Sequence, residues 1–257
     1  MMLDKIQFLT AGESHGKALV GIIDGIPSGL EITSDYIQMH MANRQLGYGR
    51  GGRMRIEDDL VEIISGIRYG KTIGSPISLI INNRDWDNWK DQMGIESSSS
   101  QAANVTLPRP GHADLAGVMK NDLDDIRNVL ERASARETAM RVALSTFPRK
   151  MIEDLGISIA GSVTEIGNAI IKDSAHENLT IKQIHSKTKK SKVRCISENL
   201  ENDMISEIDK CKTDGDSIGG SFEIYCEGLP YGLGSYGQWN KKYRKSSRFK
   251  NKENYQE

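Results

Sequence analysis

The sequence predicts an α+β fold, because strand-like and helix-like patterns of apolar residues both occur along one chain of 257 residues. Short apolar or alternating runs are typical of strands, and apolar residues at helical spacing are typical of helices. A chain of this length can bury a substantial core, in one large domain or two small ones. It contains no recognisable internal repeat.

The strand-like runs are spread along the chain. In order, they are Lys5–Leu9, Leu19–Asp24, Leu60–Ile67, Ile77–Ile81, Ile157–Ile166 and Ile218–Cys226. Two polar stretches interrupt them. Ser97–Gln101 is rich in serine, and we expect it to be a mobile loop. Asn168–Lys192 is rich in lysine, and we expect it at the solvated rim of the fold.

Two segments are predicted to be helical. The first begins with Thr33 or Ser34 as N-cap and ends near Arg44. The second covers Ala133 to Leu155, and we expect a kink or break at Pro148 inside it. The apolar positions of this second helix are Ala139, Val142, Ala143 and Leu144.

The composition argues against several classes of protein. A net charge of −1 and a pI near 6.5 argue against a nucleic-acid or membrane-surface protein. No apolar run approaches the length of a membrane span, and Met1–Lys5 does not begin a secretion signal. Cys195, Cys211 and Cys226 are odd in number and lack the spacing of a zinc site. We therefore expect a cytoplasmic protein with reduced thiols, no metal site, and no nucleic-acid or membrane partner.

Two histidines lie in glycine-rich segments, His15 within Ala11–Gly16 and His112 within Arg109–Asp114. Flanking glycines let the backbone approach a ligand closely, and the charge of histidine changes near neutral pH. A positioned general acid contributes roughly 10²–10⁴ in rate. We therefore expect both imidazoles to transfer protons. The other histidines fit structural or surface positions: His40, His176 and His185.

Arginines form two groups. In the first group glycines separate the arginines, which allows several guanidinium groups to converge on one anion and bind it bidentately. The second group lies close to His112 in sequence. Both groups could serve one polyanionic ligand, although a run of charges is also typical of a solvated face. The groups are Arg44, Arg50, Arg53 and Arg55, and then Arg109, Arg132 and Arg136.

One glycine motif is misleading. Gly47–Gly52 satisfies the G-x-G-x-x-G pattern of dinucleotide-binding folds. That pattern requires a preceding strand and a following helix, whereas here a helix precedes it and a strand-like region follows. We reject a dinucleotide-binding fold of this type.

Several long segments, in the order found in one family, resemble the motifs of chorismate synthases. They cover almost everything from Ile6 to about Trp239, and their number and order make the resemblance specific. They are Ala11–Gly16, Arg44–Arg55, Gly66–Pro76, Arg109–Ala113, Arg132–Thr138 and Gly228–Ser235.

The resemblance implies a β-α-β sandwich within the α+β class and a homotetramer. It implies a lyase of the shikimate pathway of aromatic amino-acid biosynthesis. The substrate, 5-enolpyruvylshikimate 3-phosphate, becomes chorismate by 1,4-trans-elimination of phosphate and a proton. The family requires reduced FMN although the reaction has no net redox change, and some members reduce the flavin with NADPH.

The resemblance also implies which residues form the site. His15 and His112 match the two family histidines, which are proposed to protonate the leaving phosphate and the reduced flavin respectively. Arg132, Ala133 and Ser134 match a flavin-binding segment. These roles agree with the residues themselves, because a poor leaving group gains from an acid and from neutralised charge.

The arginines are assigned in the same way. Arg44 and Arg50 match positions for NADPH. Arg44, Arg50, Arg109 and Arg136 are expected to hold the substrate, which carries a phosphate and two carboxylates.

Similarity to the family stops near Gly237–Lys242. We therefore divide the chain into residues 1–239, an incomplete chorismate synthase domain, and residues 240–257, a basic tail without leucine, isoleucine or valine that we expect to be disordered. We expect a frameshift or a premature stop as its origin, and aggregation through uncovered apolar faces. The part of the family pattern that is not matched normally supplies further flavin contacts, an arginine and a proton-accepting aspartate.

Two other functions stay open. The chain could be an inactive truncated remnant that binds only the substrate or full-length subunits. It could also bind nucleic acid through the basic tail, and such binding would weaken steeply with salt. Turnover with chemically reduced FMN separates the enzyme from both alternatives.

Overall fold

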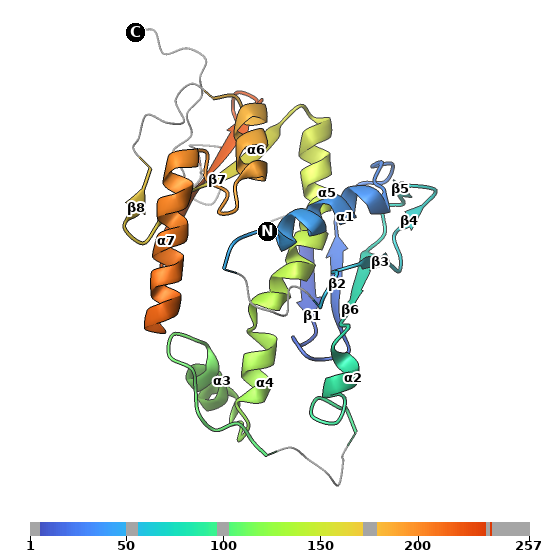
Figure 1. Cartoon of the computed structure of the whole chain (residues 1–257). Coiled ribbons are helices and arrows are strands. Elements are labelled where there is room, and N and C mark those ends of the chain that lie inside the picture. The colour runs from blue at the N-terminus through green and yellow to red at the C-terminus, as the bar shows by residue number, and fades with distance from the viewer. Residues whose placement is uncertain (1–5, 50–55, 97–102, 172–178, 235–236, 238–257) are drawn as a thin grey trace. The chain divides into compact units, whose positions relative to one another are not determined.

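A computed structural model describes residues 6–49, 56–96, 103–171, 179–234 and 237 (Figure 1). The chain divides into two compact units. The first comprises described residues of 6–45 and 56–151, and the second those of 46–49 and 152–237. Several predictions fall outside the described residues: the Ser97–Gln101 loop, the 240–257 tail with its boundary, and Arg50, Arg53, Arg55 and His176.

A four-stranded antiparallel sheet forms the base of the first unit, in the order β1-β2-β6-β3 (Figure 1). β2 is an inner strand, and its Gly21 pairs with Thr10 on one side and with Leu79 on the other. The loop between β1 and β2 therefore lies at one end of the sheet, next to the start of β2. The strands are β1 (Gln7–Ala11), β2 (Ala18–Asp24), β6 (Ile77–Asn82) and β3 (Val61–Ile63).

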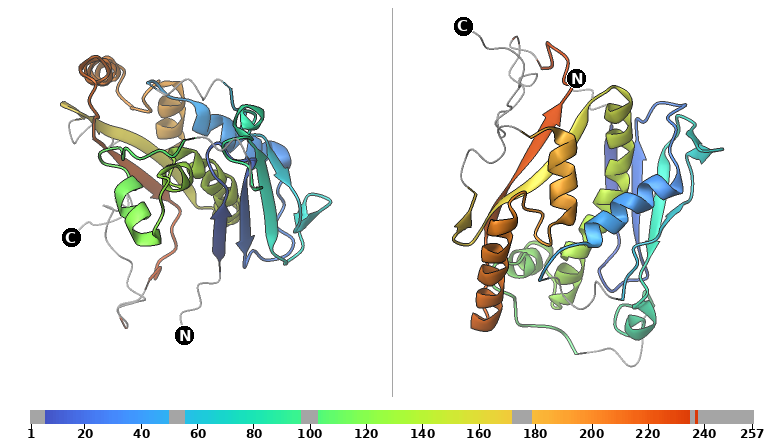
Figure 2. Two further views of the ribbon diagram at one scale, coloured as in Figure 1. Left: turned by 90° about the horizontal axis from the view of Figure 1, so that it is seen from below. Right: turned by 45° about the horizontal axis from the view of Figure 1, so that its top comes forward.

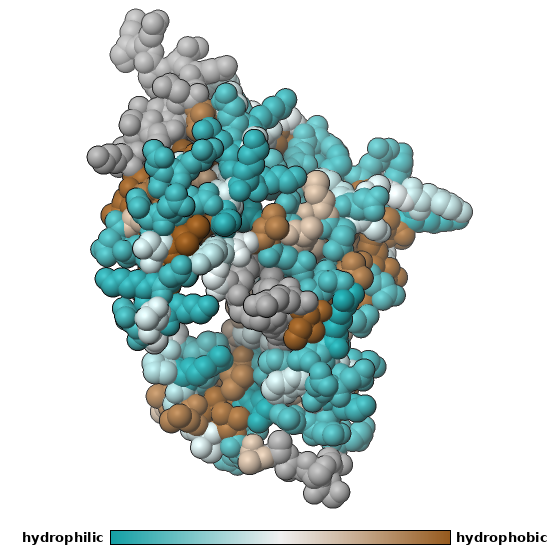
Figure 3. Space-filling view, viewed as in Figure 1, coloured by the Kyte–Doolittle hydropathy of each residue, from teal (hydrophilic) through white to brown (hydrophobic). Residues whose placement is uncertain are grey.

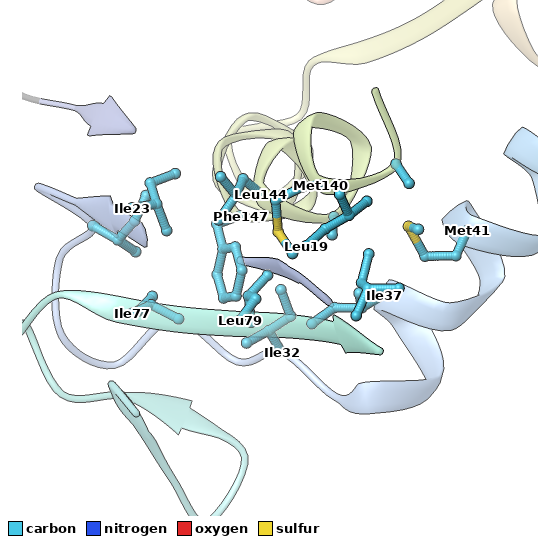
Figure 4. Packing of buried hydrophobic residues seen from close by; sticks show 14 of the residues in the cluster. Leu19, Ile23, Ile32, Ile37, Met41, Ile77, Leu79, Met140, Leu144 and Phe147 are labelled. Atoms are coloured by element: carbon cyan, nitrogen blue, oxygen red, sulfur yellow. The ribbon is translucent and has the colours of Figure 1, made fainter. Parts of the chain in front are cut away.

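Two helices cover one face of this sheet (Figure 2). Alternate residues of β2 and β6, such as Leu19 and Leu79, are buried there because side chains alternate between the faces of a strand. Met140, Leu144 and Phe147 pack over them (Figure 4). The helices are α1 (Ser34–Gln45) and α5 (Thr138–Asp154).

Short elements fill the connections of the first unit. β4 and β5 form a small hairpin, and the others lie between the sheet and α5 in sequence. They are β4 (Ile67–Arg68), β5 (Lys71–Thr72), α2 (Trp86–Trp89), α3 (Asp114–Asn121), α4 (Arg127–Arg132) and the 3₁₀ helix η2 (Ala135–Glu137).

The strand predicted over Leu60–Ile67 is wrong in its extent. β3 ends at Ile63, and the chain turns before β4 begins. Gly66 has a φ of +84°, and a Cβ there would lie 2.5 Å from Cγ1 of Ile77. Only glycine fits such a backbone position easily, so the run is broken into two strands. The predicted N-cap is confirmed, since Thr33 Oγ1 accepts a hydrogen bond from the Tyr36 N–H at 3.2 Å.

The helix α5 differs in two ways from the long helix predicted over Ala133 to Leu155. It begins at Thr138 rather than Ala133, because η2 takes up the preceding residues. The prediction of a break at Pro148 is wrong, since α5 continues through this residue to Asp154. Proline removes one helical hydrogen bond, but the buried apolar side of α5 packs on the sheet and holds the helix together.

The second unit has a three-stranded antiparallel sheet of order β8-β7-β9 and two further helices. The pairing of β7 with β9 shifts between Val163 and Glu165. Residues 46–49 belong to this unit, because the Tyr48 N–H donates to the Lys192 carbonyl at 2.8 Å. The elements are β7 (Ser158–Ile166), β8 (Ala169–Ile170), β9 (Gly220–Glu227), α6 (Ile181–Lys190) and α7 (Glu198–Asp214).

The expectation of a solvated rim over Asn168–Lys192 is wrong for its second half. This part forms α6, which begins with a capping box between Thr180 and Gln183. Ile181 and Ile184 of α6 are buried in the core of this unit with Ala160 of β7. The lysines of α6 are exposed, so composition alone concealed an amphipathic helix.

No helix among the described residues is both long and apolar enough to cross a membrane. The face seen in Figure 3 is mainly polar, with its apolar side chains in separate patches. None of the three cysteines forms a disulfide, and burial raises the pKa of the Cys226 thiol.

Candidate active site

His15 lies in the loop between β1 and β2, and α4 holds this loop. The backbone N–H of Ser14 donates to the Glu131 carbonyl at 3.0 Å, and the N–H of His15 donates to Glu131 Oε2 at 2.8 Å. Gly12 opens the loop with a φ of +100°, where a Cβ would collide with the Ala18 carbonyl oxygen at 2.3 Å. The glycine is therefore needed for the turn that positions His15.

The imidazole of His15 is fixed on two sides. Its Nδ1 lies 2.9 Å and 2.8 Å from the two carboxylate oxygens of Glu131. Its ring stacks on Trp89 of α2, with centroids 3.9 Å apart and planes 22° apart. The His15 side chain is 22% exposed, whereas that of Glu131 is 2% exposed. The ring thus reaches the surface while its anchor is buried.

Asn83, which directly follows β6, supports the same loop. Its Nδ2 donates to the Gly16 carbonyl at 2.7 Å and to the Glu13 carbonyl at 3.2 Å. Its Oδ1 accepts from Nε of Arg136 at 2.7 Å. Arg136 therefore acts on the His15 loop through Asn83.

Arg136 and Arg44 share a buried carboxylate. Nη1 of Arg136 donates to Asp59 Oδ1 at 2.5 Å, and Nη1 of Arg44 donates to Asp59 Oδ2 at 2.8 Å. Nη2 of Arg136 donates to Glu57 at 3.3 Å, so all three nitrogens of this 6% exposed side chain have protein partners. Burial lowers the pKa of Arg44, although Asp59 opposes this effect.

Arg132 ends α4, and Ala133 and Ser134 join this helix to η2 beside the His15 loop. Nη2 of Arg132 donates to the carbonyl and to the hydroxyl of Thr10, both at 2.9 Å. The Ser134 hydroxyl donates to the Ser14 hydroxyl at 3.1 Å. Nη1 of Arg132 is buried and has no hydrogen-bond partner in the described part of the chain. A buried guanidinium nitrogen requires an acceptor, so this atom fits an anionic ligand.

His112 has a carboxylate anchor of its own. Its Nδ1 is bonded to Oδ1 of Asp114, the first residue of α3, and Nη2 of Arg109 lies 3.2 Å from its Nε2. Arg109 also donates its backbone N–H to Asp114 Oδ2 at 3.0 Å. The Asp114 side chain is 0% exposed, whereas that of Arg109 is 56% exposed.

The structure connects most of the predicted site residues and separates one group. His15, Ser134 and Arg132 meet at the β1–β2 loop, and Arg136 and Arg44 reach the same loop through Asn83 and Asp59. Among the described residues, no hydrogen bond or ring contact joins His112 and Arg109 to this network. Arg50 lies outside the described residues.

Sequence reasoning missed the residues that hold the site: Glu131, Trp89, Asn83, Asp59, Glu57 and Asp114. Two of them had a readable signal. Glu131 directly precedes the Arg132–Thr138 segment, and Asp114 ends the segment that contains His112. The other contacts join residues far apart in sequence, and no local pattern marks them.

Two imidazoles on buried carboxylates, close to guanidinium groups, suit proton transfer on an anion. Residues 6–245 match the family model described as chorismate synthase. The chain belongs to the chorismate synthase family. This confirms the family resemblance seen in the motifs.

Relatives at high identity agree with this membership. A chorismate synthase of Desulforamulus reducens is 52% identical over 239 residues, and one of Enterococcus faecalis is 50% identical over 240 residues. Each match covers 92% of this chain and 61% of the relative. The chain therefore spans about three fifths of the length of the curated chorismate synthases it matches.

A solved structure supports the fold. The crystal structure of a chorismate synthase is similar with a TM-score of 0.73 and 36% sequence identity, over 92% of this chain and 62% of that chain. The predicted α+β fold of the chorismate synthase type is confirmed.

Proposed function

We propose that this chain forms the His15 side of an active site that converts 5-enolpyruvylshikimate 3-phosphate to chorismate. The bond between ring carbon and phosphate oxygen breaks, a ring C–H bond breaks in the 1,4 sense, and a new double bond forms. The observation that carries the proposal is the hydrogen-bond network joining His15 with Arg132, Ser134, Arg136 and Arg44 in a member of this family.

The two histidines are proposed to carry protons. His15, protonated on both ring nitrogens, donates the Nε2 proton to the oxygen of the leaving phosphate, while its Nδ1–H stays bonded to Glu131. His112, with its Nδ1 held by Asp114, is proposed on family grounds to hold a proton for the flavin. An acid that protonates a poor leaving group contributes roughly 10²–10⁴ in rate. The ring proton leaves to a base that we assign to no described residue.

Arginines are proposed to hold the anionic substrate. Arg109 is the best placed for direct contact, because more than half of its side chain is exposed beside His112. Arg44 and Arg136 are already bound to Asp59, which supports an indirect contribution through the shape of the His15 loop. Arg50 keeps its proposed substrate role on family grounds.

A flavin is proposed at Arg132, Ala133 and Ser134. The donor set fits this group, because Nη1 of Arg132 is buried and lacks an acceptor that an anionic cofactor can supply. When bound, reduced FMN supplies the electron density that assists loss of phosphate without net redox change. The protein residues bind it, exclude water and hold protons beside it.

NADPH fits the described residues less well. Both terminal nitrogens of Arg44 already contact protein groups, namely Asp59, Ala135 and Thr138. Arg50, the other proposed NADPH residue, lies outside the described residues. We derive no step through NADPH. A homotetramer in the cytoplasm is proposed for the whole protein on family grounds alone.

Anaerobic turnover tests the proposed function. The purified 257-residue chain is incubated with the substrate and chemically reduced FMN, and chorismate is quantified over time. The full-length relative from Enterococcus faecalis serves as the positive control. We expect chorismate that depends on both substrate and reduced flavin. Substrate binding without chorismate would contradict the enzyme and favour the inactive remnant.

A further inference from the structure

The Glu131 carboxylate binds two nitrogens of one residue. It accepts the backbone N–H of His15 at 2.8 Å, and its two oxygens lie 2.8 Å and 2.9 Å from His15 Nδ1. The two residues are 116 positions apart in sequence. A carboxylate can only accept, so Nδ1 of His15 carries the proton in this contact.

A proton on Nδ1 decides what the other ring nitrogen can do. Nε2 of His15 has no hydrogen-bond partner among the described residues, and it lies on the side of the ring opposite the anchor. Nε2 is therefore the ring nitrogen that can exchange a proton with a bound group. The free imidazole of histidine prefers the other tautomer in water, so the carboxylate has to impose this one.

Burial strengthens the hydrogen bonds that the Glu131 carboxylate accepts. The Glu131 side chain is almost completely buried, so water competes little for its oxygens. Trp89 fixes the plane of the imidazole by stacking, and its own Nε1 is held by Asp85 Oδ2 at 3.0 Å. Edge and face of the ring are thus restrained by different residues.

We propose that Glu131 is a positioning residue that keeps a proton on Nδ1 of His15, so that Nε2 is the nitrogen that gives its proton to the reacting group and the Nδ1–H tautomer is the form that remains. The catalytic consequence rests on the proposed function. The tautomer itself does not, so the two parts can be tested separately. A purely structural role would stabilise the β1–β2 loop without setting the proton on the ring.

Nitrogen NMR tests the tautomer without any substrate. The full chain is labelled with ¹⁵N-histidine, the His15 signals are assigned by their loss in His15→Asn, and spectra are recorded above the neutral range. We expect Nδ1 of His15 protonated in the wild type and in Glu131→Gln, because a glutamine oxygen still accepts. In Glu131→Ala we expect the population of the Nε2–H tautomer of His15 to increase.

Turnover tests the catalytic consequence. With reduced FMN, Glu131→Ala is expected to lower kcat roughly 10²-fold or more while KM changes little, and Glu131→Gln is expected to recover part of the loss. Glu31→Gln removes an exposed carboxylate that pairs with Lys71, and it should behave as the wild type. Circular dichroism checks that each variant is folded.

The outcomes are distinct. An unprotonated Nδ1 in the wild type, or an unchanged tautomer in Glu131→Ala, overturns the proposal. Variants with reduced thermal stability but unchanged tautomer and kcat would assign Glu131 a structural role only. A wild-type chain without turnover would refute the proposed function, while the NMR result would still decide whether Glu131 positions His15.

Discussion

Each of the two candidate proton carriers directs Nδ1 at a buried carboxylate. Glu131 holds His15, and Asp114 holds His112. The surroundings of the rings differ, because Trp89 stacks on His15 whereas Arg109 approaches His112. The two imidazoles therefore differ in the groups that surround them, although each is anchored in the same way.

Removing the His112 imidazole tests its proposed role. His112→Ala should lower turnover with reduced FMN by roughly 10²–10⁴-fold, the contribution of a positioned acid or base. Thermal stability should fall moderately, because the substitution removes one hydrogen bond from the buried Asp114 carboxylate, so circular dichroism has to show that the variant is folded at the assay temperature. His185→Ala is the matched control, since His185 is exposed on α6. Near-normal turnover in His112→Ala would defeat the assignment.

Asp114 gives the loop a pH-dependent stability. Burial alone raises the pKa of this carboxyl, but hydrogen bonds from the Arg109 backbone and from the His112 and Arg109 side chains hold it below its ordinary value of 3.8. A carboxyl with a lowered pKa stabilises the fold above its unfolded pKa, and this contribution is lost as the pH falls through the folded pKa.

We therefore expect Asp114→Asn to lower the free energy of unfolding at pH 7. The difference from the wild type should shrink as the pH falls below about 4. Urea unfolding at pH 7 and again below about pH 4 measures the difference in free energy of unfolding between the variant and the wild type. Asp87→Asn, at an exposed carboxylate, should show neither effect. A difference for Asp114→Asn that stays constant with pH would contradict this explanation.

At the scale of elements, the position of α5 on the sheet depends on a glycine. Gly21 of β2 lies directly under the helix, and a Cβ there would lie 2.5 Å from Met140 Sδ and 2.8 Å from Leu144 Cδ1. Close packing of α5 on β2 also brings the start of α5 and η2 to the end of the sheet that carries the His15 loop.

Adding one methyl group tests this packing. Gly21→Ala should destabilise the fold by roughly 1–3 kcal/mol, the usual cost of overpacking a core. Urea unfolding gives the free energy directly. Gly219→Ala is the matched control, because a Cβ there has open space within 4 Å. Equal stabilities of the two variants would show that α5 shifts freely on the sheet.

The elements that the sequence predicted best have a clear local signal, the alternating apolar residues of β2 and the N-cap of α1 at Thr33. The failures have local causes. Gly66 divides one apolar run into two strands, and lysines around Ile181 and Ile184 concealed α6. The capping box at Thr180 was a readable sign of this helix that hydrophobicity alone did not reveal.

At the scale of the whole molecule, the site is a set of long-range contacts. The residue types of the site could be predicted, because glycine-flanked histidines and grouped arginines are unusual in sequence. Their connections could not. His15 and Glu131 are 116 residues apart, and Arg136 and Asp59 are 77 apart. Only the antiparallel sheet and the helices on it bring these segments together.

The stoichiometry of products tests the central claim most directly. Phosphate and chorismate are measured together, in the absence of oxygen, after the 257-residue chain has acted on the substrate with reduced FMN. An elimination predicts equal amounts of both, and the double variant His15→Gln, His112→Gln should give neither. Phosphate without chorismate would indicate simple hydrolysis, and it would contradict the proposed function of this site.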